Sequence, residues 1–295
     1  MFFSHLRVWF VSCVFLVPTF SWRSSSTEEN KPVAIWFALS DSGRGKLSFE
    51  PFAQVTQGKL ASIPDACKED DPKYRKFSER YLKSGTSYEA RAGGAAAGKV
   101  SLTPSVDALG NYEATYTGTA RIRGRVMALA TTLSEISGRE NKRQAPTASE
   151  RAATIKLATE LYQQAGVPES ALPDLIVVNL TRTILKPATE PSFIGSFTIE
   201  ERITPEETRY DSLFFVASFL NGELKPELSE MHLSLDDKDL QSLGLVDQAD
   251  MFDSGQDNLV LQLGFYENYR YRVYGRAKDG KHWERIFETE TMGCL

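Results

Sequence analysis

Arginine and aromatic residues cluster near the C-terminus, and together they have the side chains of a binding surface. The stretches 269–276 and 282–288 are rich in strand-forming residues and flank Asp279-Gly280, a dipeptide typical of tight hairpin turns. Arginine beside aromatic rings can bind a sugar, a carboxylate or a nucleic-acid backbone. The candidate binding residues are Arg272, Tyr274, Arg276, Trp283 and Arg285.

The expected hairpin register decides which of these side chains share a face. A two-residue turn would pair Arg276 with Trp283 and Arg272 with Phe287, and it would turn Tyr271 to the other face. Such a face could take a ligand. Alternatively, it could consist of cation–π and salt-bridge packing, in which each contact contributes little.

A second candidate site lies just before this hairpin, in a loop rich in oxygen-bearing side chains. Residues 250–261 read DMFDSGQDNLVL, and residues 184–195, which read ILKPATEPSFIG, align with them at an offset of 66 positions. Each segment places a polar loop between a short strand and an apolar strand. The sequence therefore predicts two related strand–loop–strand units.

This layout resembles the FG-GAP or integrin-type repeat, in which a D-x-D-G-D-G-x-x-E loop precedes a strand. In that family, acidic side chains at alternate loop positions converge on Ca²⁺, which takes about six to eight oxygen ligands. The resemblance covers roughly the second half of the chain. It implies Asp250 as the first ligand, Ser254 at a position where a carboxylate is expected, and Asn258 as the last ligand.

The loop departs from the family pattern in ways that weaken a metal site. Phe252 occupies a ligand position and cannot coordinate a cation, and the earlier segment fills its ligand positions with Ile184, Lys186 and Ala188. We expect weak Ca²⁺ binding at best and no other cofactor. The alternative is a metal-free turn closed by Asp and Ser side-chain hydrogen bonds.

The motifs of common enzymes are missing from the sequence. The three histidines, His5, His232 and His282, do not have the His-Glu-x-x-His spacing of zinc proteases, and there is no Gly-x-Ser-x-Gly or Gly-x-Gly-x-x-Gly motif. A pair of carboxylates that meets only in the fold would leave no such signature. The sequence therefore favours a non-catalytic protein.

The N-terminus has the features of an export signal. An apolar run, Val8–Phe20, follows a basic residue and ends near the small residues Thr19 and Ser21. The run is shorter than the ~20 residues that a spanning helix needs, and no other segment could cross a bilayer. We expect a signal peptide at 1–21, a polar tail at 22–31 and a periplasmic or extracellular protein without a transmembrane span.

The predicted export also bears on whether the cysteines form a disulfide and on which binding partner the protein meets. Removal of a signal peptide takes Cys13 with it and leaves Cys67 and Cys294, which an oxidising compartment would join in one disulfide. The alternative is two free thiols. The net charge of −5 gives no field that favours nucleic acid, so we expect a protein or a cell-envelope glycan as partner.

The elements that must position these residues fall into two β-rich halves. The polar, aperiodic stretch 137–147 predicts a linker between a β-rich domain at 32–136 and a second domain at 148–295. The capping box Thr147-Ala148-Ser149-Glu150 predicts the start of one long amphipathic helix, 148–165. Its inward residues would be Ile155, Ala158, Leu161, Tyr162 and Ala165.

The remaining patterns are mostly those of strands. The first half adds one helix that begins at Asp71-Pro72, and the second half adds only a single helical turn at 238–243. The predicted fold class is mainly β, of the α+β type, with the long helix and the two related units in the second domain. An apolar content of 41% is ordinary for a folded globular protein.

Two functions from different classes are consistent with these patterns. The first is an exported, non-catalytic protein that binds another protein or a cell-surface glycan through its β domains. The alternative is a secreted hydrolase whose carboxylates come together only in the fold. A deep cleft lined by facing carboxylates would favour the hydrolase, and a flat surface of aromatic and arginine side chains would favour the binding protein.

Overall fold

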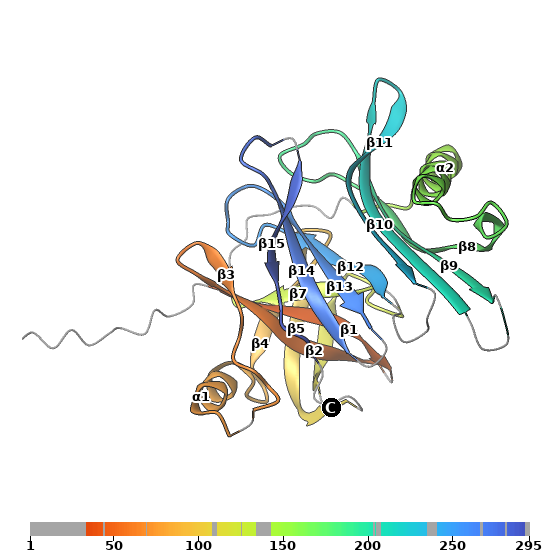
Figure 1. Ribbon diagram of the computed structural model, residues 1–295. Coiled ribbons are helices and arrows are strands. Elements are labelled where there is room, and N and C mark those ends of the chain that lie inside the picture. Colours follow the sequence, from red (N-terminus) through yellow and green to blue (C-terminus); the bar gives the residue numbers. More distant parts are fainter. Residues whose placement is uncertain are drawn as a thin grey trace, which may run out of the picture. The chain divides into compact units, whose positions relative to one another are not determined.

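Six strands near the N-terminus close into a β-barrel. The strands of this first region are β1 (Ala34–Gly43), β2 (Lys46–Thr56), β3 (Lys59–Ala61), β4 (Ser87–Ala92), β5 (Ala95–Val106), β6 (Tyr112–Gly118) and β7 (Ala128–Thr131). In the computed structural model (Figure 1), they pair antiparallel in the order β1–β7–β4–β5–β6–β2, and β2 pairs back with β1. The short β3 pairs with β2 beside this ring.

The structure describes most of the chain beyond its N-terminal segment. The described residues are 34–43, 45–68, 70–107, 111–124, 126–133, 143–202, 204, 208–234, 241–265, 268–280 and 282–292. The predicted signal peptide, the polar tail, Cys294 and residues 137–142 of the predicted linker lie outside the described residues.

Strands β1 and β2 of the barrel are buried on both faces over most of their length. Along β1, Ile35 and Phe37 belong to the core inside the barrel, whereas Trp36 and Ala38 belong to a second core outside it. Because successive side chains of a strand point to opposite faces, such a strand must be covered on both sides. The barrel wall is therefore also a packing surface for another layer.

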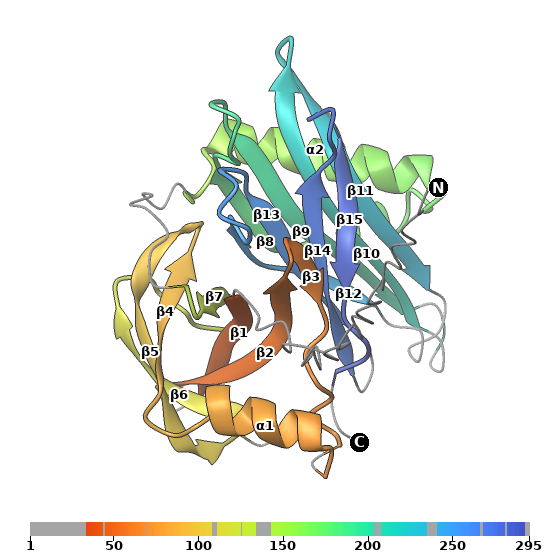
Figure 2. The ribbon, with the colours of Figure 1, turned by 90° about the vertical axis from the view of Figure 1, so that its left-hand side faces the viewer.

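A short helix, α1 (Pro72–Tyr81), lies across one end of the barrel (Figure 2). Its predicted start is confirmed, because the Asp71 side chain accepts a hydrogen bond from the Lys73 backbone N–H at 2.8 Å and Pro72 occupies the first turn. Phe77 joins the core inside the barrel. The helix thus covers apolar side chains that the barrel end would otherwise expose.

Two four-stranded antiparallel sheets form the rest of the structure. The first meander consists of β8 (Leu175–Thr183), β9 (Ser192–Arg202), β10 (Thr208–Leu220) and β11 (Glu223–Ser234), and the second meander consists of β12 (Ser242–Ala249), β13 (Asn258–Gly264), β14 (Tyr269–Arg276) and β15 (Trp283–Glu288). In each meander, strands that are consecutive in the sequence are neighbours in the sheet. The prediction of a mainly β protein with several sheets is confirmed.

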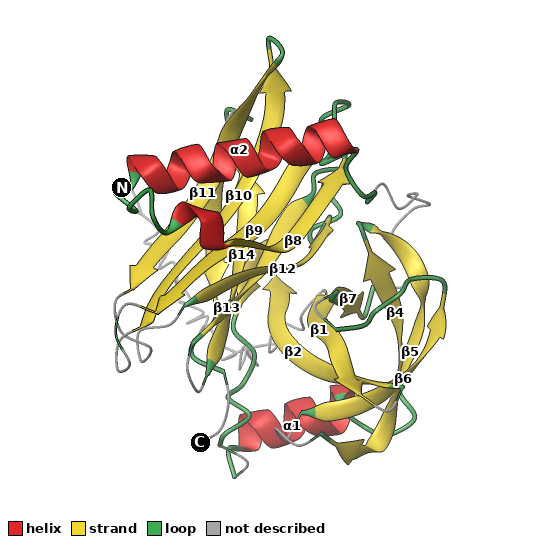
Figure 3. Ribbon diagram, turned by 90° about the vertical axis from the view of Figure 1, so that its right-hand side faces the viewer, coloured by secondary structure: helices red, strands yellow, loops and turns green. Residues whose placement is uncertain are grey.

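The elements of the unit Pro32–Leu295 stack in layers, which run from α2 (Ala148–Gln164) through the first meander and the second meander to the barrel (Figures 1 and 3). Each interface has its own apolar core. Leu213 and Phe215 of β10 pack toward α2, while Phe214 and Val216 pack toward the second meander. Val260 of β13 reaches the core shared with the barrel.

The second meander and the barrel share one hydrophobic core across the predicted domain boundary. An ion pair holds the predicted linker to the second meander, because the Arg143 guanidinium lies 3.0 Å from the buried Asp247 of β12. The backbone N–H of Gly93, in the turn between β4 and β5, donates to the same carboxylate at 2.9 Å. Residues on the two sides of the stretch 137–147 therefore contribute to one shared core.

The helix α2 begins at the predicted capping box, with Thr147 and Glu150 exchanging the expected side-chain to backbone hydrogen bonds. Its buried face differs in part from the prediction. Ala158 and Tyr162 are buried as expected, but Ala165 is exposed and Leu157 is buried in its place. The reason is that Ala165 follows the last helical residue and so leaves the face that packs on the first meander.

One strand of the second meander is missing from the sequence-based expectation. The stretch Ser242–Ala249 is strand β12, which includes the last two residues of the helical turn predicted at 238–243. Residues 238–240 of that predicted turn lie outside the described residues. Its Gly244 and Asp247 are unfavourable strand residues, but pairing with β13 and the ion pair to Arg143 outweigh that preference. Among the helices in the described part of the chain, none has the length and apolarity to cross a membrane.

Candidate functional site

Strand β14 lies at the centre of the candidate sites, because its two faces meet different partners. Its alternating side chains define an arginine face, consisting of Arg270, Arg272, Tyr274 and Arg276, and a tyrosine face, consisting of Tyr269, Tyr271 and Val273. Tyr274 of the arginine face joins the core with the first meander, and the tyrosine face joins the core with the barrel.

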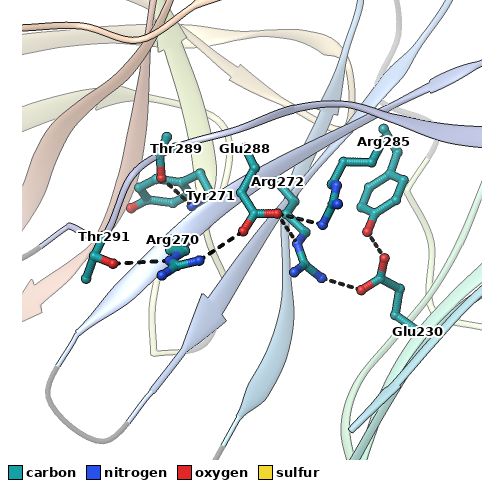
Figure 4. Close-up of polar contacts among 9 residues, drawn as sticks. Glu230, Arg270, Tyr271, Arg272, Arg285, Glu288, Thr289 and Thr291 are labelled. Atoms are coloured by element: carbon teal, nitrogen blue, oxygen red, sulfur yellow. Dashed lines mark hydrogen bonds and ion pairs between the residues drawn. The ribbon is translucent and has the colours of Figure 1, made fainter.

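The arginine face holds most of the predicted binding residues, and it is a network of ion pairs (Figure 4). The Arg272 guanidinium lies 2.5 Å from Glu230 of β11 and 2.7 Å from Glu288 of β15. The Tyr274 hydroxyl donates to the same Glu230. Burial alone would raise the pKa of Glu288, but the hydrogen bond and the charge of Arg272 outweigh burial and leave that pKa below its ordinary value.

The same face continues at the end of the hairpin. The Arg276 guanidinium lies 2.6 Å from Glu227 and 4.3 Å from the centre of the Trp283 ring, and the indole N–H donates to Glu227 at 3.3 Å. Arg276 is paired opposite Trp283, as predicted. These contacts tie the second meander to β11 of the first.

The other predicted pair is wrong, because the ladder between β14 and β15 is irregular. A register shift between Val273 and Tyr274 places Arg272 opposite Glu288 instead of Phe287. Arg285, with half of its side chain exposed, also pairs with Glu288. Of the five predicted binding residues, Arg272, Tyr274, Arg276 and Trp283 are turned inward, and Arg285 alone is exposed.

A shallow groove of about 600 Å³ runs beside this network. Its lining residues are Arg270, Arg285, Glu288, Thr289, Glu290 and Thr291. Several of them already satisfy one another, since Arg270 and Arg285 both pair with Glu288 and the Arg270 guanidinium donates to Thr291. The groove therefore offers few groups that a ligand could engage without first breaking these pairs.

The candidate calcium loop joins β12 to β13 and is closed by its own hydrogen bonds. The buried Asp250 carboxylate accepts from the backbone N–H of Ser254 at 2.8 Å and of Gly255 at 2.6 Å, and the Ser254 hydroxyl donates to it as well. Asn258 accepts from the Met251 N–H at 3.2 Å. Within the described ranges, no group of three or more His, Cys, Asp or Glu side chains is arranged to hold a metal ion.

The two segments that align in the sequence occupy equivalent places and lie side by side. Each forms the loop between the first and second strands of a meander. The Lys186 N–H donates to the Asp257 carboxylate at 2.8 Å, and the Asp257 N–H donates to the Lys186 carbonyl at 3.1 Å. A further bond joins the Thr183 hydroxyl to Gln248 at 2.9 Å. The loops therefore bind each other.

Of the predicted disulfide, one cysteine lies among the described residues. Cys67 follows β3, and it is disulfide-bonded. The pairing with Cys294 stays a prediction.

The tyrosine face of β14 meets a buried glutamate of the barrel wall. Glu50 lies on the outer side of β2, next to Phe49, which points into the barrel core. The Tyr269 hydroxyl donates to one oxygen of the Glu50 carboxylate and the Tyr271 hydroxyl to the other, each at 2.5 Å. These two bonds connect residues that are 219 and 221 positions apart in the sequence.

Burial dominates the electrostatics of Glu50. It raises the pKa of Glu50 from 4.5 to about 7, although the hydrogen bonds from Tyr269 and Tyr271 act to lower it, and the nearby charge of Asp107 raises it further. Burial and the Glu50 charge also raise the pKa of both tyrosines, so their hydroxyls stay protonated and donate. Glu50 thus changes its charge near neutral pH.

Glu50 borders a cavity of about 290 Å³ between the barrel and the second meander, which we call the acidic cavity. Its lining residues are Ser40, Asp41, Ser42, Ser48, Glu50, Asp107, Asn111, Gln262, Tyr269 and Tyr271. All of these described lining residues are polar, three of them are acids, and none of them is a lysine, arginine or histidine. Asp41 accepts from the Gly124 and Gly43 N–H groups, and these bonds, together with the charge of Arg123, hold the pKa of its carboxyl below the usual value.

Sequence reasoning missed the acidic cavity, although one signal for it exists. Glu50 stands in the buried run 47–53 of β2, between Phe49 and Pro51, and a charged residue in a segment that is buried on both faces requires a specific partner. Tyr271 was correctly expected on the face opposite the arginines. Nothing local in the sequence connects the two residues.

Comparison with known proteins gives no match to this chain: no protein-family model, no curated protein and no solved structure is significantly similar to it.

Proposed function

We propose that the protein is an exported, non-catalytic binding protein and that its ligand site is the acidic cavity. The ligand would be a hydroxyl-rich molecule without negative charge, of the kind that a cell-surface glycan presents. The observation that carries this proposal is the lining of the cavity, which consists of polar side chains with three acids and no cation among the described residues.

The size and chemistry of the cavity support a small polar ligand. Ligand pockets usually start at about 300 Å³, so a cavity of about 290 Å³ suits a single sugar ring. Carboxylates and side-chain amides such as Asp107, Asn111 and Gln262 accept or donate hydrogen bonds to hydroxyl groups. The ring of Tyr269 adds an apolar surface. An anionic ligand would meet repulsion from the acids.

The scaffold gives a further argument for binding over catalysis. We propose that the two meanders are related units, because the aligned segments form the same loop in each sheet. Two related units are also what the resemblance to FG-GAP-type repeats implies. In the present chain the loop needs no calcium, since its Asp250 carboxylate accepts two backbone N–H groups.

Calorimetric titration with neutral mono- and oligosaccharides of the cell envelope tests the proposal. We expect binding by the wild type and a loss of about tenfold in affinity for Gln262→Ala, because a hydrogen-bonding group of the cavity is removed. The matched control is Arg285→Ala, on the other side of the second meander, which should bind as the wild type does. Equal losses in both variants, or no binding to any sugar, would reject the proposal.

A secreted glycoside hydrolase is the second candidate, and one observation favours it. Glu50 has a pKa raised to about 7 by burial and lies near a second carboxyl, Asp107, as the acid of a glycosidase pair does. Both oxygens of Glu50, however, already accept a tyrosine hydroxyl. Steady hydrolysis of aryl glycosides by the wild type, abolished in Glu50→Gln, would favour the hydrolase over the binding protein.

A further inference from the structure

We infer that the ligand of the acidic cavity carries a protonated primary amine, as an amino sugar does, and that Glu50 and Asp107 recognise the ammonium group. The inference rests on the proposed function, because it names the ligand class of the same cavity. It is carried by two separate observations: the cavity itself, and the way in which Glu50 differs from the other buried acids.

The other buried acids in the described residues are compensated by arginine or by backbone N–H groups. Asp247 lies 3.0 Å from Arg143, and Asp211 lies 2.6 Å from Arg209. Asp250 and Asp257 accept backbone N–H groups of their own or a neighbouring loop. This is the usual arrangement, because a buried charge without such donors is costly.

Among the described residues, the hydrogen-bond donors to Glu50 are of neither kind. Its two bonds come from the hydroxyl groups of Tyr269 and Tyr271, which carry no charge. A carboxylate has about four lone-pair positions, so each oxygen can accept one more hydrogen bond. Because Glu50 borders the cavity, a ligand can supply the missing positive charge from that side.

Among the described residues that line the cavity, the groups around Glu50 are acceptors and acids. Arg123 is close enough for its charge to act on Asp41, another acid of the lining. Tyr269 and Tyr271 face it from β14, Gln262 lines the cavity from β13, and Asp107 approaches from the end of β5. Asp107 is close enough for its charge to act on Glu50. An ammonium group has three donors, which these acceptors match, and its attraction to two carboxylates exceeds that of a neutral hydroxyl.

The same geometry predicts how binding depends on pH. The ammonium pairs best with an ionised Glu50, and the pKa of Glu50 in the free protein is about 7. The affinity for an amine should therefore increase as the pH rises from 6 toward 8, until the amine itself loses its proton. A neutral sugar lacks this dependence on the charge of Glu50.

Calorimetry with matched sugars tests the inference. The probes are D-glucose, D-glucosamine and N-acetyl-D-glucosamine, together with the three galactose counterparts, so that only the group on one ring carbon changes. We expect each amino sugar to bind at least about tenfold more tightly than its neutral counterparts. In Asp107→Asn this preference for the amine should shrink by about tenfold, because one of the two carboxylates is lost.

The outcomes separate the inference from the proposed function. Equal or tighter binding of the neutral sugars would overturn the inference and leave the proposed function standing. Absence of binding by all six sugars would overturn both. Glu50→Gln provides a second variant: if it folds, it should lose both the amine preference and the rise in affinity with pH, and retention of both would overturn the inference.

Discussion

The two faces of strand β14 carry different ionisable residues, arginines on one face and tyrosines on the other, and the charges that they meet are compensated in different ways. On the arginine face, Arg272 and Arg276 meet glutamates of β11 and β15, so each positive charge has a negative partner. On the tyrosine face, Tyr269 and Tyr271 donate to Glu50, and a cavity adjoins this group in which the described lining residues include no cation.

The difference indicates which face is structural and which is available to a ligand. Paired charges fix the first meander against the second and leave only a shallow groove at the rim. An acid whose charge is not neutralised within the protein lowers stability, and proteins retain such groups mainly at functional sites. The residues that look most like a binding surface in the sequence are therefore mostly packing residues, whereas the acidic cavity is the better site.

The largest expected effect comes from the ionisation of Glu50. Its pKa is about 7 in the folded protein and 4.5 in the unfolded chain, so between these pH values the folded state holds a proton that the unfolded state has lost. The free energy of unfolding should therefore fall by about 3 kcal/mol as the pH rises from 4.5 to 7, and this contribution should be constant above 7. Urea unfolding at several pH values measures the change.

The control for this prediction is Glu50→Gln, which cannot ionise at that position. Other groups titrate in both proteins, so the informative quantity is the difference between the two curves. The variant should gain about 3 kcal/mol relative to the wild type across the same window. If the two curves of unfolding free energy against pH ran parallel, the pKa of Glu50 would be the same in the folded and the unfolded chain. Glu50 would then not differ from the compensated acids on the arginine face.

A smaller effect is expected from breaking the arginine face. Arg272→Ala leaves Glu230 and Glu288 without their shared partner in a site that is only partly exposed, so we expect a loss of about 2 kcal/mol in the free energy of unfolding. Arg285→Ala is the matched control, because its half-exposed side chain also pairs with Glu288 and should cost less than about 1 kcal/mol. Similar losses in the two variants would show that the inner pairs are no stronger than the surface pair.

The smallest effect concerns the loop between β12 and β13. The Asp250 carboxylate already accepts two backbone N–H groups, so calcium has to displace protein donors before it can bind. Calcium or EDTA should therefore shift the melting temperature by less than about 1 °C. A clear rise in the melting temperature with calcium would contradict this prediction. It would mean that Asp250 binds a ligand although backbone N–H groups already compensate its charge, so compensation would no longer distinguish Asp250 from Glu50.

Local signals in the sequence predicted much of the fold. The capping box at Thr147 and the cap at Asp71 give the helix starts, and the hairpin of β14 and β15 appears with Arg276 opposite Trp283. Strand β12 was missed because Gly244 and Asp247 have low strand preference, and the ion pair that compensates comes from Arg143, about a hundred positions away.

The candidate site could not be predicted in the same way, because it is assembled from distant segments. The alternation of β14 correctly separates its tyrosines from its arginines, but it does not say which face is covered by glutamates. That depends on the stacking of the meanders and the barrel, which brings Glu50 to Tyr269 across 219 positions. The buried position of Glu50 in β2 indicates from the sequence that this acid needs a partner. That Tyr269 and Tyr271 are its partners follows only from the three-dimensional structure.

The most direct test of the account is to locate a bound sugar by crystallography after soaking with D-glucosamine. The account predicts electron density in the acidic cavity, with the amine within hydrogen-bond distance of Glu50 or Asp107. Density in the groove beside Arg270 and Arg285, or an empty cavity at a concentration that saturates binding in solution, would contradict it.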